Sequence, residues 1–164
     1  MIQNPASFDH LDVILASGSP RRQMLLKELG LKFTVLIREV EESFPSDHDH
    51  RQVAEYLAVK KSDAYKDLLV ENKVIITADT LVFLKNKILN KPSDFDEAVQ
   101  MLKSLSGNSH EVVTGVCIAS ANRQKVFHVV TKVFFRELMD EEVVYFVDQF
   151  QPYDKAGAYG AQDW

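Results

Sequence analysis

The sequence predicts a mixed fold of the α/β or α+β class. Short apolar, β-branched runs such as Val13–Leu15 predict buried strands, whereas apolar residues recur at helical spacing over 51–69. Two long, mostly apolar segments flank Asn122-Arg123, which is typical of a β-hairpin. Helices and strands therefore mix along one chain.

The first strand leads directly into a helix. Ser19 is a favourable N-cap, and Pro20 suits the first helical position. Gly30 is expected to end this helix. Its apolar face is supplied by Met24, Leu25, Leu26 and Leu29.

The other elements follow from the same patterns. Ser93 is expected to cap one helix, and Asp140 to open another. In chain order we expect a strand at 32–40, a helix at 51–69, a strand at 74–84 that turns back into Ile88-Leu89, a helix at 94–105, a hairpin of strands 110–120 and 125–135, and a helix at 141–150.

Composition limits the classes of function. The chain has 164 residues and a net charge of −5, which fits one domain over residues 1–164 and argues against a dedicated nucleic-acid or membrane-surface protein. Cys117 is the only cysteine, so a reducing compartment, the cytoplasm, is expected. We interpret Cys117 as a core residue. We find no secretory signal or membrane-spanning segment in the sequence.

Arg21 and Arg22 fall in the first turn of the predicted helix, where the helix dipole disfavours cations. A bound phosphate would reverse this effect by accepting hydrogen bonds from the helix N–H groups and the guanidinium groups. Two solvated arginines on a surface helix are the alternative.

Asp79 interrupts a strand that is otherwise apolar. A buried carboxylate there would bind a metal, act as a base or pair with a cation such as a lysine. Lys60 and Lys61 lie on the apolar stripe of the predicted 51–69 helix, where a long side chain reaching out to solvent is the simpler interpretation.

Three more acids lie at the end of the predicted 32–40 strand: Glu39, Glu41 and Glu42. They fit a solvated strand end, or, together with Asp79, a Mg²⁺ site. Residues 47–50 alternate Asp and His, but adjacent loop residues cannot converge on one zinc ion. His110 and His128 read as ordinary strand residues. A covalent serine mechanism at Ser17 or Ser19 is discounted, because no nucleophile-elbow sequence is present.

With these motifs the chain resembles the Maf family of nucleotide pyrophosphatases. The match runs from Leu11 to Gln162 and is carried by seven pieces in the family's order. They are Ala16-Ser17-Gly18-Ser19-Pro20-Arg21-Arg22, Glu41-Glu42, Ala58-Val59-Lys60-Lys61, Ala78-Asp79-Thr80, Lys91-Pro92, Leu105-Ser106-Gly107 and 154–162.

The resemblance implies a Maf- and ITPase-like fold, with an elongated mixed sheet flanked by helices and a cleft between two lobes. It implies hydrolysis of a nucleoside triphosphate to the monophosphate and pyrophosphate, with Mg²⁺ or Mn²⁺ as cofactor. A homodimer is expected by resemblance only. Nucleic acid and membrane are not expected partners.

The resemblance also assigns roles. Asp79 would be the general base, and Glu42 and Asp79 would hold the metal. Phosphate oxygens would be bound by Ser17, Arg22, Lys61 and Lys91. Arg21, Thr80 and Gln162 match the positions by which the dTTP and UTP branch selects its base, whereas the 7-methyl-GTP branch tends to have Ser-Asp-Gln in place of Ala78-Asp79-Thr80.

Residues 1–10 form an N-terminal extension before the matching residues. Two features depart from the family pattern. The family usually continues beyond the position of Gln162 with a strand and a helix. The family also more often has Ile before this glutamine and Gly after it. The alternatives to a dTTP/UTP pyrophosphatase are a 7-methyl-GTP pyrophosphatase, a nucleotide-binding regulator of cell division or septum formation, and a phosphatase that releases orthophosphate.

Overall fold

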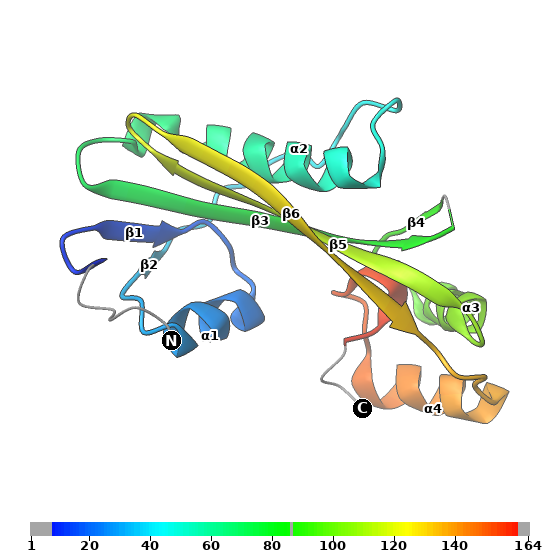
Figure 1. Cartoon of the computed structure of the whole chain (residues 1–164). Helices are drawn as coiled ribbons and strands as arrows, with labels where there is room; N and C mark the ends of the chain where they lie inside the picture. The colour runs from blue at the N-terminus through cyan, green and yellow to red at the C-terminus, as the bar shows by residue number, and fades with distance from the viewer. Residues whose placement is uncertain (1–7, 86, 161–164) are drawn as a thin grey trace. The chain divides into compact units, whose positions relative to one another are not determined.

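The computed structural model describes residues 8–85 and 87–160 and has a six-stranded mixed sheet (Figure 1). The strand order is β2-β1-β3-β5-β6, and β4 pairs with β3. The strands are β1 (Asp12–Leu15), β2 (Thr34–Val35), β3 (Lys73–Leu84), β4 (Lys87–Leu89), β5 (Ser109–Ser120) and β6 (Gln124–Phe134). β1 runs parallel to β2 and β3, whereas β4 is antiparallel to β3.

Helices accompany the sheet, so the predicted mixed α/β class is confirmed. In the described residues the α-helices are α1 (Pro20–Glu28), α2 (His50–Asp63), α3 (Phe95–Leu105) and α4 (Asp140–Phe150). Two short 3₁₀ helices are η2 (Lys66–Leu68) and η3 (Ala156–Ala158). None of these helices is long and apolar enough to cross a lipid bilayer.

The chain divides into two compact units. The first unit comprises Met1–Asp79 and Thr114–His128, and the second comprises Thr80–Val113 and Val129–Trp164. The strands β3, β5 and β6 contribute residues to both units.

In the first unit, α2 lies over the sheet (Figure 1), and its backbone closely approaches β5. A Cβ atom placed on Gly115 of β5 would lie 2.1 Å from the carbonyl oxygen of Ala54, so only glycine fits there. Ala54 and Ala58 are completely buried on the helix face that meets the strands. The Thr77 hydroxyl of β3 donates to the Ala58 carbonyl oxygen at 2.7 Å. Small residues and one hydrogen bond therefore fix α2 close to β3 and β5.

Specific residues set both ends of α2. Asp49 is the N-cap, and its carboxylate accepts from the backbone N–H groups of Arg51 and Gln52, both at 2.9 Å. The helix ends at Asp63, before the predicted end at residue 69. Tyr65 leaves helical geometry, and its ring is buried in a cluster with Ile14 and Ile75.

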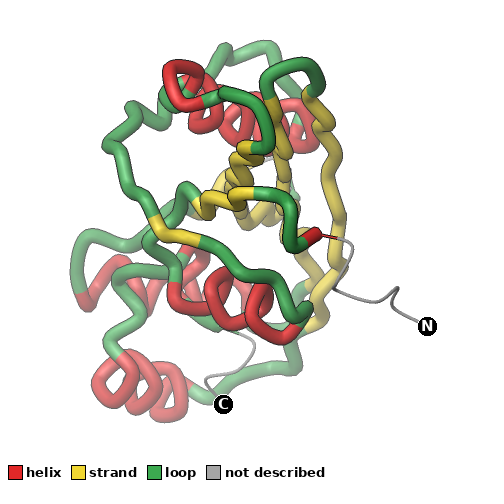
Figure 2. The backbone as a smooth tube through the Cα atoms, turned by 90° about the vertical axis from the view of Figure 1, so that its left-hand side faces the viewer, coloured by secondary structure: helices red, strands yellow, loops and turns green. Residues whose placement is uncertain are grey.

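The predicted strand at 32–40 is wrong beyond β2. Its last paired residue is Val35, opposite Leu15, and β1 ends there, so the following residues have no strand to pair with. Residues 36–43 form neither helix nor strand, and they belong to the loops drawn in green in Figure 2.

Helix α1 begins as predicted but does not bury its apolar face. Ser19 is the N-cap, Pro20 is the first helical residue, and Gly30 follows the helix with φ of 71°. Met24, Leu25 and Leu29 remain 47%, 54% and 49% exposed, because no described residue covers them. The predicted apolar face of this helix is therefore largely exposed in the described part of the chain.

The second unit has its own core between α3 and α4. Ala98, Met101 and Leu102 of α3 pack against Val143, Phe146 and Val147 of α4. The N-cap of α3 is Asp94 and not the predicted Ser93, because the Asp94 carboxylate accepts from the Glu97 N–H at 2.9 Å.

The two strand histidines have structural partners, as expected for ordinary strand residues. His110 is buried in the second unit and lies 2.6 Å from the Tyr159 hydroxyl through Nε2. Burial lowers the pKa of His110. In the first unit, His128 Nδ1 lies 2.7 Å from a Glu55 carboxylate oxygen and links β6 to α2.

We predict that Gly115→Ala strongly destabilises the protein. The added methyl group would overlap the Ala54 carbonyl, and a helix backbone cannot move aside as a flexible side chain can. We expect a loss of about 3 kcal/mol or more in the free energy of unfolding, measured by urea denaturation. Ser109→Ala, at the exposed start of β5, should change stability by less than about 0.5 kcal/mol. An unchanged midpoint for Gly115→Ala would show that α2 does not pack this closely.

Candidate active site

Asp79 lies on the face of β3 that is covered by α2. Residues 75, 77 and 79 alternate onto one face of the strand, and Thr77 on that face bonds to α2. The Asp79 side chain is only 10% exposed, and its Oδ1 accepts from the Lys61 ammonium. The structure therefore confirms a buried carboxylate within an apolar strand and pairs it with a lysine.

Lys61 also binds a second carboxylate. Its Nζ lies 2.7 Å from Oε1 of Glu42, so one ammonium group bridges Glu42 and Asp79. The Lys61 side chain is 18% exposed, whereas the Glu42 side chain is 54% exposed. Glu42 therefore forms the outer rim of the cluster and Asp79 its buried end.

Arg22 approaches the cluster from the start of α1. Its Nη1 donates to the Ala78 carbonyl oxygen at 2.7 Å and to the Ser17 hydroxyl at 3.3 Å. Ser17 is buried, and its hydroxyl also accepts from the Ser19 backbone N–H at 3.3 Å. The start of α1 thus directs one guanidinium group toward the strand that carries Asp79.

For both Asp79 and Arg22, burial and the nearby opposite charges shift the pKa in opposite directions. Burial raises the pKa of Asp79, while Lys61 and Arg22 oppose this shift. Burial also lowers the pKa of Arg22, although Asp79 and Glu42 favour its charged form. The buried carboxylate is therefore more basic than an ordinary aspartate, and two cations stabilise its ionised form.

The two carboxylates fit a hard divalent cation. Mg²⁺ is commonly bound by one or two carboxylates, with waters and substrate phosphates completing its coordination. Glu42 and Asp79 supply such a pair because both reach the same ammonium group. No cluster of three or more His, Cys, Asp or Glu side chains suited to a metal occurs among the described residues, so a site made of protein ligands alone is not indicated.

The remaining predicted residues are not all brought into this cluster. Arg21 is exposed on the first turn of α1, beside Arg22. Thr80 follows Asp79 in β3 and is half-buried, and Lys91 is exposed after β4, both in the second unit. Gln162 lies outside the described residues.

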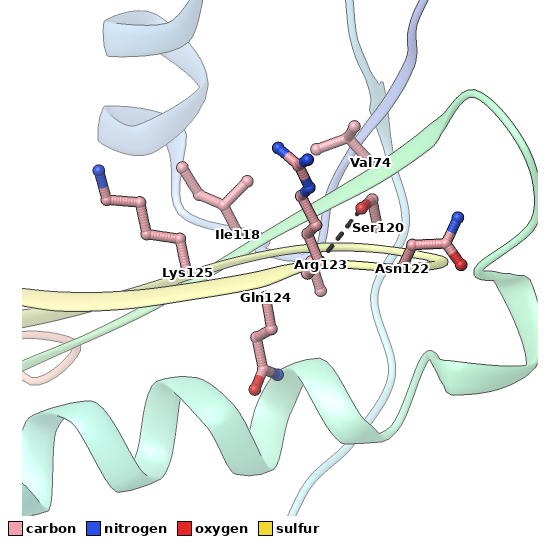
Figure 3. Close-up of a pocket in the computed structure, with 8 residues that line it drawn as sticks. Val74, Ile118, Ser120, Asn122, Arg123, Gln124 and Lys125 are labelled. Carbon is pink, nitrogen blue, oxygen red and sulfur yellow. Dashed lines mark hydrogen bonds between the residues drawn. The ribbon is translucent and has the colours of Figure 1, made fainter.

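A pocket at the tip of the β5–β6 hairpin contains none of the predicted site residues (Figure 3). It is lined by Val74 of β3, Ile118 of β5 and the turn around Arg123. The Ser120 hydroxyl donates to the Arg123 carbonyl oxygen at 3.3 Å and stabilises the turn. Its lining has no carboxylate, so it offers neither a base nor the ligands that Mg²⁺ prefers.

Comparison with protein families decides the classification. The family model described as Maf-like protein matches residues 12–164. The chain belongs to the Maf family. This match spans both units and every predicted site residue, including Gln162.

Curated Maf relatives share much of the sequence. One from Flavobacterium psychrophilum, named dTTP/UTP pyrophosphatase, is 44% identical over 157 residues, covering 96% of this chain and 80% of the relative. A relative of the same name from Bacteroides thetaiotaomicron is 45% identical over 159 residues, covering 96% and 82%. Among solved structures, the Ham1 protein of Staphylococcus aureus matches with a TM-score of 0.55 at 18% identity, over 79% of this chain and 72% of that chain. This structural match supports the fold.

Some residues that support this candidate site are not marked by the sequence patterns. Gly115, Thr77 and Tyr65 were not singled out, although each fixes the position of α2 or of a neighbouring segment. A glycine inside an apolar strand is a sequence signal for close backbone approach. The hydrogen bonds of Thr77 and Tyr65 have no such signal, because their partners are carbonyl groups far away in the sequence.

Proposed function

We propose that this Maf protein hydrolyses dTTP and UTP between the α- and β-phosphates, releasing the nucleoside monophosphate and pyrophosphate. The observation that carries the proposal is the cluster in which Lys61 bridges the carboxylates of Asp79 and Glu42. Arg22 lies beside Asp79 through its bond to the Ala78 carbonyl. The names of the relatives from Flavobacterium psychrophilum and Bacteroides thetaiotaomicron support the same reaction and base preference.

Asp79 acts as the general base that removes a proton from the attacking water. A carboxylate that burial makes more basic suits this role better than a solvated one. Asp79 and Glu42 also hold Mg²⁺ or Mn²⁺, which, when bound, neutralises phosphate charge and lowers the pKa of bound water.

Ser17, Arg22 and Lys61 bind the phosphate oxygens, and Lys91 contributes another ammonium group. The hydroxyl of Ser17 and the guanidinium of Arg22 are already 3.3 Å apart, so they present donors together. The start of α1 adds backbone N–H groups and a favourable dipole for anions. Phosphoryl transfer depends mainly on such charge neutralisation and positioning.

Base selection is assigned to Arg21, Thr80 and Gln162. A hydroxyl and an amide can hydrogen-bond the polar edge of uracil or thymine, and a mismatched base would leave these groups unpaired. As further proposals from the resemblance, the protein acts in the cytoplasm, forms a homodimer and removes unwanted or modified nucleotides.

We predict that Asp79→Asn abolishes pyrophosphate release and largely spares nucleotide binding. The amide keeps the shape of the side chain but cannot accept the proton from water. Turnover can be measured by pyrophosphate release, and binding by isothermal titration with dTTP. Asp63→Asn, which changes an exposed acid paired with Lys66, is the control and should retain full activity. Undiminished turnover in Asp79→Asn would exclude this residue as the base. A wild-type protein that binds dTTP but releases no pyrophosphate would favour a nucleotide-binding regulator.

A panel of nucleoside triphosphates tests the base preference. With Mg²⁺ or Mn²⁺ present, we expect kcat/KM to be highest for dTTP and UTP, because Thr80 occupies the position that is Gln in the 7-methyl-GTP branch. Canonical and modified triphosphates should be compared at equal metal concentration. A preference for 7-methyl-GTP would contradict the assignment to the pyrimidine branch.

A further inference from the structure

Glu42 lies in a segment that the sheet does not hold. The segment of residues 36–43 follows β2 and forms neither helix nor strand, and residues 44–49 connect it to α2. Ladder hydrogen bonds to β1 end with the bond from Leu36 N–H to the Leu15 carbonyl at 3.2 Å. An exposed segment of this kind gains order only from specific contacts, because fixing each residue costs conformational entropy.

The first contact anchors the beginning of the 36–43 segment. The Tyr65 hydroxyl donates to the Leu36 carbonyl at 3.0 Å and accepts from the Arg38 backbone N–H at 2.7 Å. The Tyr65 ring is 1% exposed and packs with Ile14 and Ile75, so the hydroxyl projects from a rigid position.

The Arg38 side chain reinforces this anchor. Its guanidinium lies 4.9 Å from the centre of the Tyr65 ring and forms a bidentate pair with Asp67, at 2.6 and 2.9 Å. It also donates to the Ala64 carbonyl at the end of α2. Planar, bidentate pairs of this kind define geometry better than single surface ion pairs.

The second contact anchors the other end of the segment. The Lys60 ammonium donates to the Ser43 carbonyl at 3.0 Å and to the Ser43 hydroxyl at 2.7 Å. Lys61, the next residue of α2, binds Glu42, the residue before Ser43. Consecutive lysines of the helix therefore hold consecutive residues of the segment, and the function proposed above uses only one of these lysines.

We infer that Lys60 and Tyr65 are positioning residues, which hold the 36–43 segment so that Glu42 shares a divalent cation with Asp79. The inference rests on the proposed function, because it takes Glu42 as a metal ligand. Neither Lys60 nor Tyr65 touches the metal or the substrate. Both act by restraining the backbone on either side of Glu42, as outer-shell groups restrain the ligands of other metal sites.

The test compares Mn²⁺ affinity in Lys60→Met, Tyr65→Phe and the wild type, by electron paramagnetic resonance of free Mn²⁺ without nucleotide. Each variant should bind Mn²⁺ about tenfold more weakly, the lower end of the effect of removing outer-shell groups. The Mg²⁺ concentration for half-maximal pyrophosphate release should rise by a similar factor. The rate at saturating Mg²⁺ should fall by a smaller factor.

Two further variants control for structure and charge. Lys66→Met removes another lysine of the first unit, one that pairs with Asp63, so it should bind Mn²⁺ as the wild type does. Lys60→Arg keeps a cationic donor and should recover most of the affinity. Urea midpoints identify any variant that fails to fold, and Lys60→Met tests the inference alone if Tyr65→Phe is unstable.

The outcomes separate this inference from the proposed function. Wild-type Mn²⁺ affinity in folded Lys60→Met and Tyr65→Phe, with an active wild type, would overturn the positioning role only. Equal losses in Lys66→Met would also overturn it, because they would reflect charge alone. A wild type that binds no Mn²⁺ and releases no pyrophosphate would overturn both.

Discussion

The close approach of α2 to the sheet is the constraint on which the rest of the first unit depends. Gly115 leaves no room for a side chain, and the Ala54 backbone occupies that space. The hydrogen bond between Thr77 and Ala58 then joins α2 to β3. Because Lys61 and Asp79 follow these two residues closely along the helix and the strand, the Lys61 ammonium reaches Asp79 on the same face. A helix held further from the sheet by larger side chains would leave the Asp79 carboxylate buried without its cation.

Burying the Asp79 carboxylate without a cation would cost free energy, so its partner matters for stability as well as for function. An ionised carboxylate in an apolar strand needs opposite charges or it becomes protonated. Lys61 and Arg22 provide these charges, and both are groups that bind phosphate well. The pairing of Asp79 with Lys61 is therefore compatible with the catalytic role proposed for this residue. The same ion pair offsets the cost of burying Asp79 and places its carboxylate beside groups that bind anions.

The sequence predicts most of the elements because their signals are local. Ser19 and Pro20 start α1, Asn122-Arg123 marks the hairpin, and the buried character of Asp79 follows from its apolar neighbours. The errors arise where distant partners decide the structure. The predicted 32–40 strand fails because β1 is only four residues long. The apolar side chains of α1 stay exposed because no other described residue covers them.

The residues of the candidate site also divide into those with a local sequence signal and those placed by distant partners. The motifs around Ser17, Lys61 and Asp79 identify the charged groups, and the structure brings them together. Neither residue spacing nor the family resemblance indicates that Tyr65 and Lys60 hold the segment that carries Glu42. These contacts join residues 17 to 29 positions apart through backbone atoms, which leave no pattern in the sequence.

The most direct test of the account is the identity of the products. Phosphorus-31 NMR can follow dTTP incubated with the purified protein and Mg²⁺, since the monophosphate, diphosphate, orthophosphate and pyrophosphate give separate signals. Cleavage by water at Asp79 between the α- and β-phosphates predicts thymidine monophosphate and pyrophosphate in equal amounts. Thymidine diphosphate with orthophosphate would contradict it, because the terminal phosphate would then be the group removed.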